Sequence, residues 1–357
     1  MGQKLSICIF QFKIYNEVAR NMVHLALLGA WHVHTKNFVK EALKTGIAEL
    51  KVVWDDDEER GKAFAEQFGV AYEGDLDSVL SRKDIDAVMV ECATAMHKEV
   101  IIKAANAKKH IFTDKALALT VQDCLAIKKA ILDNGVKFAV SLESKIIGPY
   151  RYAKTLVDEG KLGRVTSAYF RRAHQAALDK TMLPTYWFDP AQTGGGVTLD
   201  LGCHGLYLLP HFCGMPKKVT CLMNELYGTG SDENSTTIIE FDSEAIGTSH
   251  TSFVSYRIDN LLEIIGTEGI LVISGTNKSN FRVLLQSKHV PGHENLMPVP
   301  SENVPEDDEL PSAQFVRLVS SDTELSLPYF DIDAAIGITR LIECAYESAK
   351  EQRHVMY

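Results

Sequence analysis

The residues best suited to chemistry lie in one short segment near the middle of the chain. Three consecutive glycines, Gly194–Gly196, precede an apolar stretch that we expect to be helical and that carries Asp200 and His204. These two residues are four positions apart, so they lie on the same face of a helix. A carboxylate beside an imidazole can orient the ring and raise its basicity, as a general base for an alcohol proton requires. The same spacing also fits an ordinary helix pair that has no catalytic role.

A second candidate site is the loop after the first apolar run. Val23–Leu28 is followed by Gly29 and then by a helical pattern at Lys36–Thr45, which is the context of a dinucleotide-binding loop. The glycine pattern itself is poor, because Trp31 stands at the second glycine position and His34 at the third. We expect the Trp31 ring to turn away from the path of the pyrophosphate. The loop residues predicted to contact a cofactor are Gly29, Ala30, Trp31, His32 and Val33.

An acidic cluster strengthens the prediction of a nucleotide site. Asp55 ends the next apolar run about 20 residues past the loop, near the spacing of an acid that holds the adenosine ribose hydroxyls. Asp55–Asp57 can also cap the following helix, whose dipole favours acids at this end, and both roles can hold together. Three acids would repel a 2′-phosphate, which favours NAD over NADP, although Arg60, also a predicted cofactor contact, weakens this preference slightly.

The order of the elements that must position these residues indicates two domains of different kinds. Apolar runs first alternate with helical patterns, as in a doubly wound parallel sheet, and longer alternating strands follow, as in an α+β domain with one open, mostly antiparallel sheet and helices on one face. We therefore predict four segments: an N-terminal leader or extra edge strand at 1–21, a Rossmann-type dinucleotide-binding domain at 22–143, an α+β substrate and oligomerisation domain at 144–330, and a closing helix at 331–357.

The segment around the three glycines resembles the signature of the glucose–fructose oxidoreductase / inositol dehydrogenase (Gfo/Idh/MocA) family. It carries a W-x-D-P run at Trp187–Pro190 and a G-G-G-x-x-x-D-x-G-x-H run that ends at His204. Shorter matches are Ala93–His97 for the family's A-T-P-x-x-H segment, Thr113–Leu117 for its E-K-P-L segment and Ile264–Gly269 for its second-domain hairpin. The resemblance runs from about Met22 to the C-terminus in compatible order.

The resemblance implies a role for each residue of the candidate active site. Lys115 would contact the reacting hydroxyl and the nicotinamide region. Asp200 would position the substrate and tune the base, and His204 would remove the hydroxyl proton while a hydride passes to the nicotinamide. Lys115 also fits a surface lysine, but its place at the carboxyl end of a strand favours function. Tyr186 and Trp187 are expected to line the substrate pocket.

Other histidines and neighbouring residues complete the set of predicted contacts. Thr94 and His97 are expected near the cofactor, with His97 either structural or close to the nicotinamide ribose. His32 and His34 have no carboxylate or cysteine at ligand spacing, so no metal site is predicted.

Some residues depart from the family's pattern. Ala116 stands where the family has the proline of E-K-P, and Asp114 is shorter than the usual glutamate. Together with Trp31 and His34, these departures leave open a member with weakened cofactor binding or with lost catalysis.

The sequence thus predicts an NAD-dependent oxidoreductase that transfers a hydride between nicotinamide and a hydroxyl of a sugar, cyclitol or related polyol. Two alternatives stay open: a glycosidase-like hydrolase of the same fold that uses NAD transiently, and a non-catalytic protein that senses a sugar or nucleotide. No residue pattern names the substrate.

Composition restricts the class of protein further. The chain has 357 residues and a formal net charge of −10, which argues against nucleic acid and anionic membranes as partners. No stretch is long and apolar enough to span a bilayer. The seven scattered cysteines form no C-x-x-C pair, as expected of a reduced, cytoplasmic protein. The family resemblance implies a homodimer or homotetramer.

Overall fold

The computed structural model describes residues 22–321 and 326–357, so the predicted leader lies outside the described residues. The chain divides into two compact units. Unit 1 consists of residues 22–114, Leu125–Ser141 and Leu310–Ile332, and unit 2 consists of Lys115–Cys124, Leu142–Glu309 and Asp333–Tyr357. The peptide bond between Asp114 and Lys115 therefore marks the passage from one unit to the other.

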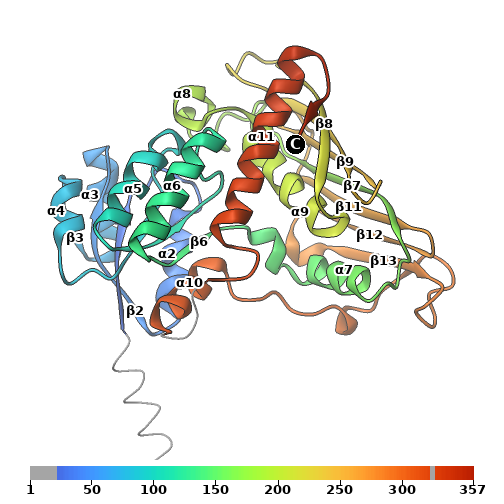
Figure 1. Ribbon diagram of the computed structural model, residues 1–357, viewed down its shortest axis with the longest axis horizontal. Helices are drawn as coiled ribbons and strands as arrows, with labels where there is room; N and C mark the ends of the chain where they lie inside the picture. The colour runs from blue at the N-terminus through green and yellow to red at the C-terminus, as the bar shows by residue number, and fades with distance from the viewer. Residues whose placement is uncertain (1–21, 322–325) are drawn as a thin grey trace, which may run out of the picture. The chain divides into compact units, whose positions relative to one another are not determined.

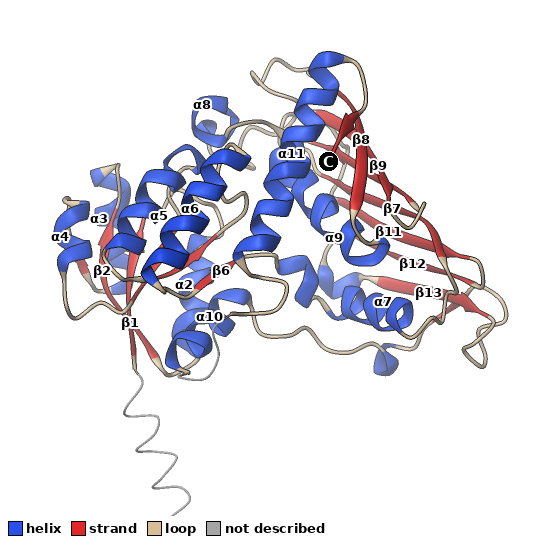
Figure 2. Cartoon of the chain, viewed as in Figure 1, coloured by secondary structure: helices blue, strands red, loops and turns tan. Residues whose placement is uncertain are grey.

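Unit 1 is built on a parallel six-stranded sheet in the order β3-β2-β1-β4-β5-β6 (Figures 1 and 2). The strands are β1 Val23–Leu28, β2 Ala48–Trp54, β3 Ala71–Tyr72, β4 Ala87–Val90, β5 His110–Thr113 and β6 Phe138–Val140. The strand order reverses at β1, which pairs with β2 on one side and β4 on the other. Doubly wound sheets bind ligands outside the carboxyl ends of their strands at such a reversal. The loop that follows β1 occupies this position.

The helices of unit 1 connect these strands, except for α10, which comes from a later segment of the chain. They are α2 Thr35–Lys44, α3 Glu58–Phe68, α4 Leu76–Ser81, α5 His97–Asn106, most of α6 Val121–Asn134, and α10 Pro311–Ser320. Gly69 ends α3 in the left-handed conformation (φ 67°), which glycine adopts readily after the last turn of a helix. Helix α10 returns from late in the chain and packs against α2, with Phe315 5.8 Å from Phe112 between ring centres.

Unit 2 is built on a nine-stranded sheet in the order β14-β13-β12-β11-β7-β10-β9-β8-β15 (Figure 1). All neighbours are antiparallel except β7 and β10. The strands are β7 Val165–Ala173, β8 Pro216–Asn224, β9 Asn234–Phe241, β10 Ile246–Ser252, β11 Asp259–Gly266, β12 Gly269–Gly275, β13 Arg282–Ser287, β14 Met297–Pro298 and β15 Val355–Met356. The predicted fold class, a parallel Rossmann-type sheet plus a mostly antiparallel open sheet, is confirmed.

The principal helices of unit 2 lie on one face of this sheet, as Figure 2 shows for α7 Gly148–Asp158, α9 Cys203–Cys213 and α11 Ile332–Glu351. Helix α9 packs on β7 and β10. A short helix, α8 Pro190–Thr193, and a π-helical turn at Thr198–Gly202 lead into α9. Among the helices of residues 22–321 and 326–357, none has the length and apolar character that a membrane crossing requires.

Candidate active site

The loop after β1 is fixed by hydrogen bonds to the carboxyl ends of its neighbouring strands. Gly29 has a φ of 94°, and a Cβ there would lie 2.5 Å from the Cα of Cys92, so the position requires glycine. The Gly29 amide donates to the Trp54 carbonyl (2.7 Å) and the Ala30 amide to Oδ2 of Asp55 (2.6 Å). The loop therefore takes its shape from β2 and β4 before any ligand binds.

The side chains of this loop that sequence reasoning assigned to the cofactor are largely buried. Trp31 is 3% exposed, and its amide donates to the Glu91 carbonyl (3.2 Å). His32 lies between two carboxylates, with Nε2 2.5 Å from Asp114 Oδ2 and Nδ1 4.0 Å from Glu91 Oε2. Asp114, the shortened acid of the family's segment, thus pairs with His32. Val33 is exposed.

Helix α2, which follows the loop, suits a phosphate at its start. The residue at its N-cap position, His34, makes no side-chain hydrogen bond to the first amides. The amino end of a helix carries partial positive charge and attracts anions. The pyrophosphate of a dinucleotide would meet this helix end beside the Gly29 turn.

Asp55 is held by the protein itself. Its buried carboxylate receives Arg60 through Nε (3.0 Å) and Nη2 (2.5 Å), and it also accepts the Asp57 amide (2.8 Å). Arg60 Nη2 reaches Asp56 as well (2.8 Å). Burial and then the neighbouring Asp55 charge raise the pKa of Asp56. Asp57 caps α3 by accepting the Arg60 amide, as predicted.

Thr94 and His97 follow β4 at the same edge of the sheet. Thr94 begins a 3₁₀ turn, Thr94–Met96, and His97 begins α5. Both side chains are buried, and His97 Nε2 lies 3.1 Å from the Cys92 carbonyl oxygen. This contact gives His97 a structural role in the turn after β4, and a further role toward a cofactor stays a prediction.

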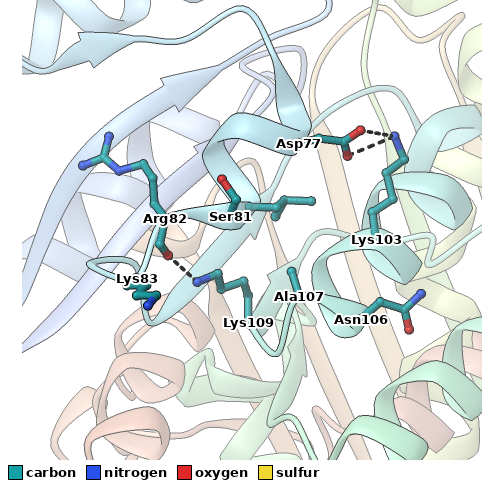
Figure 3. Close-up of a pocket in the computed structure, with 9 residues that line it drawn as sticks. Asp77, Ser81, Arg82, Lys83, Lys103, Asn106, Ala107 and Lys109 are labelled. Atoms are coloured by element: carbon teal, nitrogen blue, oxygen red, sulfur yellow. Dashed lines mark hydrogen bonds and ion pairs between the residues drawn. The ribbon is translucent and has the colours of Figure 1, made fainter.

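A cavity of about 470 Å³ lies at the opposite edge of the unit 1 sheet, before β4 and β5, and Figure 3 shows its lining. It is rich in cations, and Arg82, Lys103 and Lys109 each contact a partner in the protein. Lys109 Nζ donates to the Arg82 carbonyl (2.6 Å), Lys103 pairs with Asp77 (3.2 Å), and Arg82 pairs with Asp84 (2.7 Å). The cavity lies before β4 and β5, whereas a doubly wound sheet binds its ligand outside the carboxyl ends of the strands, so this cavity is no candidate for the reaction site.

In unit 2, the glycine run is required by close packing. A Cβ at Gly195 would lie 2.0 Å from Oη of Tyr346, and one at Gly196 would lie 2.1 Å from the Asp232 carbonyl oxygen. The buried Asp232 carboxylate accepts the amides of Gly196 (2.9 Å) and Thr198 (2.7 Å). These contacts anchor the start of the helical segment that carries Asp200 and His204.

Lys115 and Asp200 lie together, although they are far apart in sequence. Lys115 Nζ is 3.3 Å from Asp200 Oδ1 and donates to the Asp200 carbonyl oxygen (3.1 Å). Asp200 Oδ2 accepts Nε1–H of Trp187 (3.2 Å). Asp200 lies in the π-helical turn, a feature often found at functional sites. Tyr186, beside Trp187, is half-buried, and the Lys115–Ala116 peptide bond is cis.

His204 is held from its Nδ1 side by two residues that sequence reasoning missed. Nδ1 is 2.7 Å from Tyr207 Oη and 3.2 Å from Ser144 Oγ, and the Ser144 amide donates to Tyr207 Oη (3.1 Å). Arg172 Nη2 reaches Ser144 Oγ (3.4 Å). Burial raises the pKa of Tyr207, which keeps its hydroxyl protonated. The three-residue spacing of His204 and Tyr207 was the available signal in the sequence.

His174 is a third residue that the sequence did not single out. Its ring stacks on Phe253 at 5.0 Å between centres, and its Nδ1 accepts the Ala176 amide (3.2 Å). Burial lowers the pKa of His174, and the Asp200 charge acts in the opposite direction. His174 is therefore within electrostatic reach of the candidate site. Nothing in the sequence paired it with Asp200.

Comparison with known families identifies the class of protein. Residues 23–142 match the profile described as "Oxidoreductase family, NAD-binding Rossmann fold", and residues 150–272 match "GFO/IDH/MocA C-terminal domain". The chain belongs to the Gfo/Idh/MocA family of oxidoreductases, and unit 1 contains its NAD-binding Rossmann fold. Among the described residues, no group of three or more His, Cys, Asp or Glu side chains is arranged to hold a metal ion.

Individual relatives are similar over most of their length. The scyllo-inositol 2-dehydrogenase (NAD(+)) of Bacillus subtilis (strain 168) is 28% identical over 283 residues, which cover 75% of this chain and 78% of that protein. The 2,7-anhydro-N-acetylneuraminate hydratase of Escherichia coli (strain K12) is 28% identical over 69% of this chain and 67% of its own length. A structure of levoglucosan dehydrogenase in complex with NADH and levoglucosan superposes with a TM-score of 0.83, at 18% identity over 94% of this chain and 99% of that one, which supports the fold.

Proposed function

We propose that this protein is an NAD-dependent dehydrogenase that transfers a hydride between nicotinamide and a hydroxyl group of a sugar, cyclitol or related polyol. The observation that carries the proposal is the pairing of Lys115 with Asp200 on the segment that also holds His204. Bound NAD supplies the hydride acceptor. Unit 2 then has to bind the alcohol, remove its proton and stabilise the charge that develops on its oxygen.

His204 is the proposed base, and its working atom is Nε2. Nδ1 faces Tyr207 and Ser144, so a proton on Nδ1 donated to these oxygens leaves the lone pair on Nε2. A histidine has a pKa near neutral pH in its unperturbed state, which suits it to abstract an alcohol proton. Tyr207 and Ser144 are positioning residues in this scheme.

Lys115 is the proposed electrostatic partner of the reacting oxygen. An ammonium aimed at a developing alkoxide stabilises it, and the effect is strong where water is excluded. Lys115 is 9% exposed, and Asp200 holds its Nζ from one side. Asp200 also fixes Trp187, which with Tyr186 would line the substrate pocket.

The cofactor side favours NAD over NADP. Asp55 to Asp57 form an acidic cluster, and the Arg60 guanidinium is engaged by Asp55 and Asp56. A 2′-phosphate would meet these carboxylates while the nearby cation is already paired. The proposed cofactor contacts are Gly29, Ala30, Trp31, His32, Val33, Asp55, Arg60, Thr94 and His97.

The relatives support the substrate class. They include dehydrogenases named for scyllo-inositol, D-xylose and levoglucosan, all of which are sugars, sugar anhydrides or cyclitols.

The proposed location is the cytoplasm. The six described cysteines are all free and buried, as suits a reducing compartment. We propose that the protein is a homodimer or homotetramer there.

The experiment that tests the proposal is NADH formation across a panel of sugars and cyclitols, with NAD and NADP run in parallel. We expect at least one member to be oxidised, and faster with NAD. No cofactor reduction with any member, by a protein that binds NAD, would contradict the proposal.

A second candidate is a reaction in which NAD is used transiently and no NADH accumulates. The similarity to a 2,7-anhydro-N-acetylneuraminate hydratase supports this second candidate. The same panel distinguishes the two, since a transient use of NAD gives a changed sugar, a requirement for NAD and no net absorbance at 340 nm. A sensing protein would bind sugar and NAD and give neither result.

A further inference from the structure

We propose that a cavity in unit 2 is a subsite for the carboxylate of an acidic sugar. The cavity measures about 200 Å³, which suits one substituent or a small ring. Its walls include Ala176, Lys180, Thr185, Phe188, Tyr227 and Thr229. The inference rests on the proposed function and narrows its substrate class to sugars or polyols that carry an anionic group.

The charge of the cavity points to an anion. Lys180 is the one charged residue of the lining. Within the described part of the chain, its ammonium makes no hydrogen bond or ion pair. Its side chain is exposed, so an anion that binds in the cavity can reach the ammonium.

Two acids that lie close in sequence to lining residues are engaged by the protein. Asp179, adjacent to Lys180, accepts the Thr181 amide (3.0 Å) and hydroxyl (2.6 Å). Glu233, fully buried, accepts the amides of Leu226 and Tyr227 (both 2.7 Å), which shapes the loop that forms one wall. Neither carboxylate is directed to Lys180, and a carboxylate from a ligand would meet it.

The remaining walls suit a sugar. Phe188 is fixed edge-on against Phe253 at 5.9 Å, and Ala176 and Ala177 are buried in the same apolar cluster. Tyr227 is 60% exposed, so its ring is available at the cavity mouth. Apolar sugar C–H groups pack on such surfaces, while a few placed polar groups orient the ligand.

Two chain segments connect the cavity to the candidate catalytic residues. Trp187 donates to Asp200, and the next residue, Phe188, lines the cavity. The Asp200 charge acts to raise the pKa of His174 against the lowering by burial. Nδ1 of His174 accepts the amide of Ala176, which also lines the cavity. In the proposed binding mode, a substrate whose hydroxyl lies at Asp200 reaches Lys180 with another of its substituents.

The test measures binding and turnover of matched sugars with and without a carboxylate. The probes are D-glucose against D-glucuronate, D-galactose against D-galacturonate, and N-acetylneuraminate against its methyl ester. We expect at least one acid to bind about tenfold more tightly than its neutral partner, the effect of one hydrogen bond to a charged group. Lys180→Met should remove this preference, whereas Lys288→Met, which removes another exposed lysine of unit 2, should keep it.

The outcomes separate this inference from the proposed function. Equal affinities for acids and neutral partners, no binding by any acid, or a preference that survives Lys180→Met would each overturn the subsite. If neutral sugars are nonetheless oxidised with NAD, the dehydrogenase proposal stands without it. Lys180-dependent binding of an acid without any cofactor reduction would support the subsite and contradict the dehydrogenase.

Discussion

The loop after β1 and the glycine run before α9 both correspond to glycine-rich motifs of the family, and they differ in how many of those glycines they retain. Each joins a turn to a helix, and each has family positions for three glycines. The loop retains only Gly29, whereas the run retains Gly194–Gly196. The loop's amides and its His32 ring contact acceptors of unit 1, and the run leads to Asp200 and the Lys115 beside it.

The difference separates glycines required by the chain from glycines required by a ligand. Gly29, Gly195 and Gly196 each face the protein's own atoms at 2.5 Å or less from a hypothetical Cβ. The second glycine of a dinucleotide loop is instead needed for close approach of the pyrophosphate. Trp31 stands at that position and packs as a buried side chain. Unit 2 therefore keeps the family's glycines at positions where internal packing requires them. Unit 1 lacks the family's glycine at a position where only the bound cofactor requires it.

The largest expected effect is at His204, which tests whether the well-matched region is catalytic. His204→Ala should lower turnover on a verified substrate by roughly 10²–10⁴-fold, the range for loss of a general base. NAD affinity should be unchanged, because His204 belongs to unit 2. The control is His354→Ala, which removes an exposed histidine of the same unit. Wild-type turnover by the His204 variant would place the base elsewhere.

A somewhat smaller loss is expected at Lys115. Lys115→Met keeps most of the aliphatic stem and removes the charge, so turnover should fall by roughly 10²–10³-fold, as for a lost oxyanion donor. Steady-state rates with saturating NAD measure this. Lys288→Met serves as the matched control. A change confined to KM would show that Lys115 binds substrate without stabilising the developing charge.

Asp200→Asn should lower turnover less than the substitutions of His204 and Lys115. It retains shape and an oxygen for Lys115 or Trp187 and removes the charge, so we expect a loss of about 10–100-fold, as for one hydrogen bond to a charged group. The pH profile of kcat is the second readout. A purely structural role would lower the melting temperature and leave that profile unshifted.

Much of the fold was predictable because its signals are local. Apolar runs alternating with helical patterns indicated the parallel sheet, and the hairpin at Thr267–Glu268 connects β11 and β12 as predicted. The return of α10 to unit 1 was not predictable, because the contact of Phe315 with Phe112 depends on tertiary packing and leaves no periodic trace. The same holds for the π-helical turn at Thr198–Gly202.

The residues of the candidate site likewise include some that the sequence could predict and some that it could not. The proximity of Lys115 and Asp200 came from the family resemblance, since no local pattern joins residues so far apart in sequence. Tyr207 was within reach of helical spacing from His204. Ser144 and His174 were not, because each reaches the site from a segment that only the folded unit 2 brings near.

The cofactor preference tests the acidic cluster of unit 1. Calorimetry should show NAD binding about tenfold more tightly than NADP, because a 2′-phosphate would lie among carboxylates whose nearby cation, Arg60, is already engaged. Asp55→Ser releases Arg60 from its bidentate contact and should narrow the preference. Asp57→Ser removes the cap of α3 and leaves the Asp55–Arg60 pair, so it should preserve the preference. Equal affinities in the wild type would overturn the assignment.

The smallest expected effect on binding is at Trp31. This test decides whether a tryptophan at the second glycine position of the loop changes NAD affinity. If the buried ring lies off the path of the pyrophosphate, Trp31→Phe should keep the NAD dissociation constant within about twofold, since it retains an aromatic ring. Trp31→Gly should lower stability by about 3–5 kcal/mol, the usual cost of emptying a large buried site. Val33→Gly adds the same backbone freedom at a neighbouring residue whose exposed side chain is a proposed cofactor contact, so a gain in NAD affinity there would come from flexibility. A gain in NAD affinity of tenfold or more in Trp31→Gly, absent from Val33→Gly, would show that the tryptophan obstructs the site and that unit 1 has moved away from tight cofactor binding.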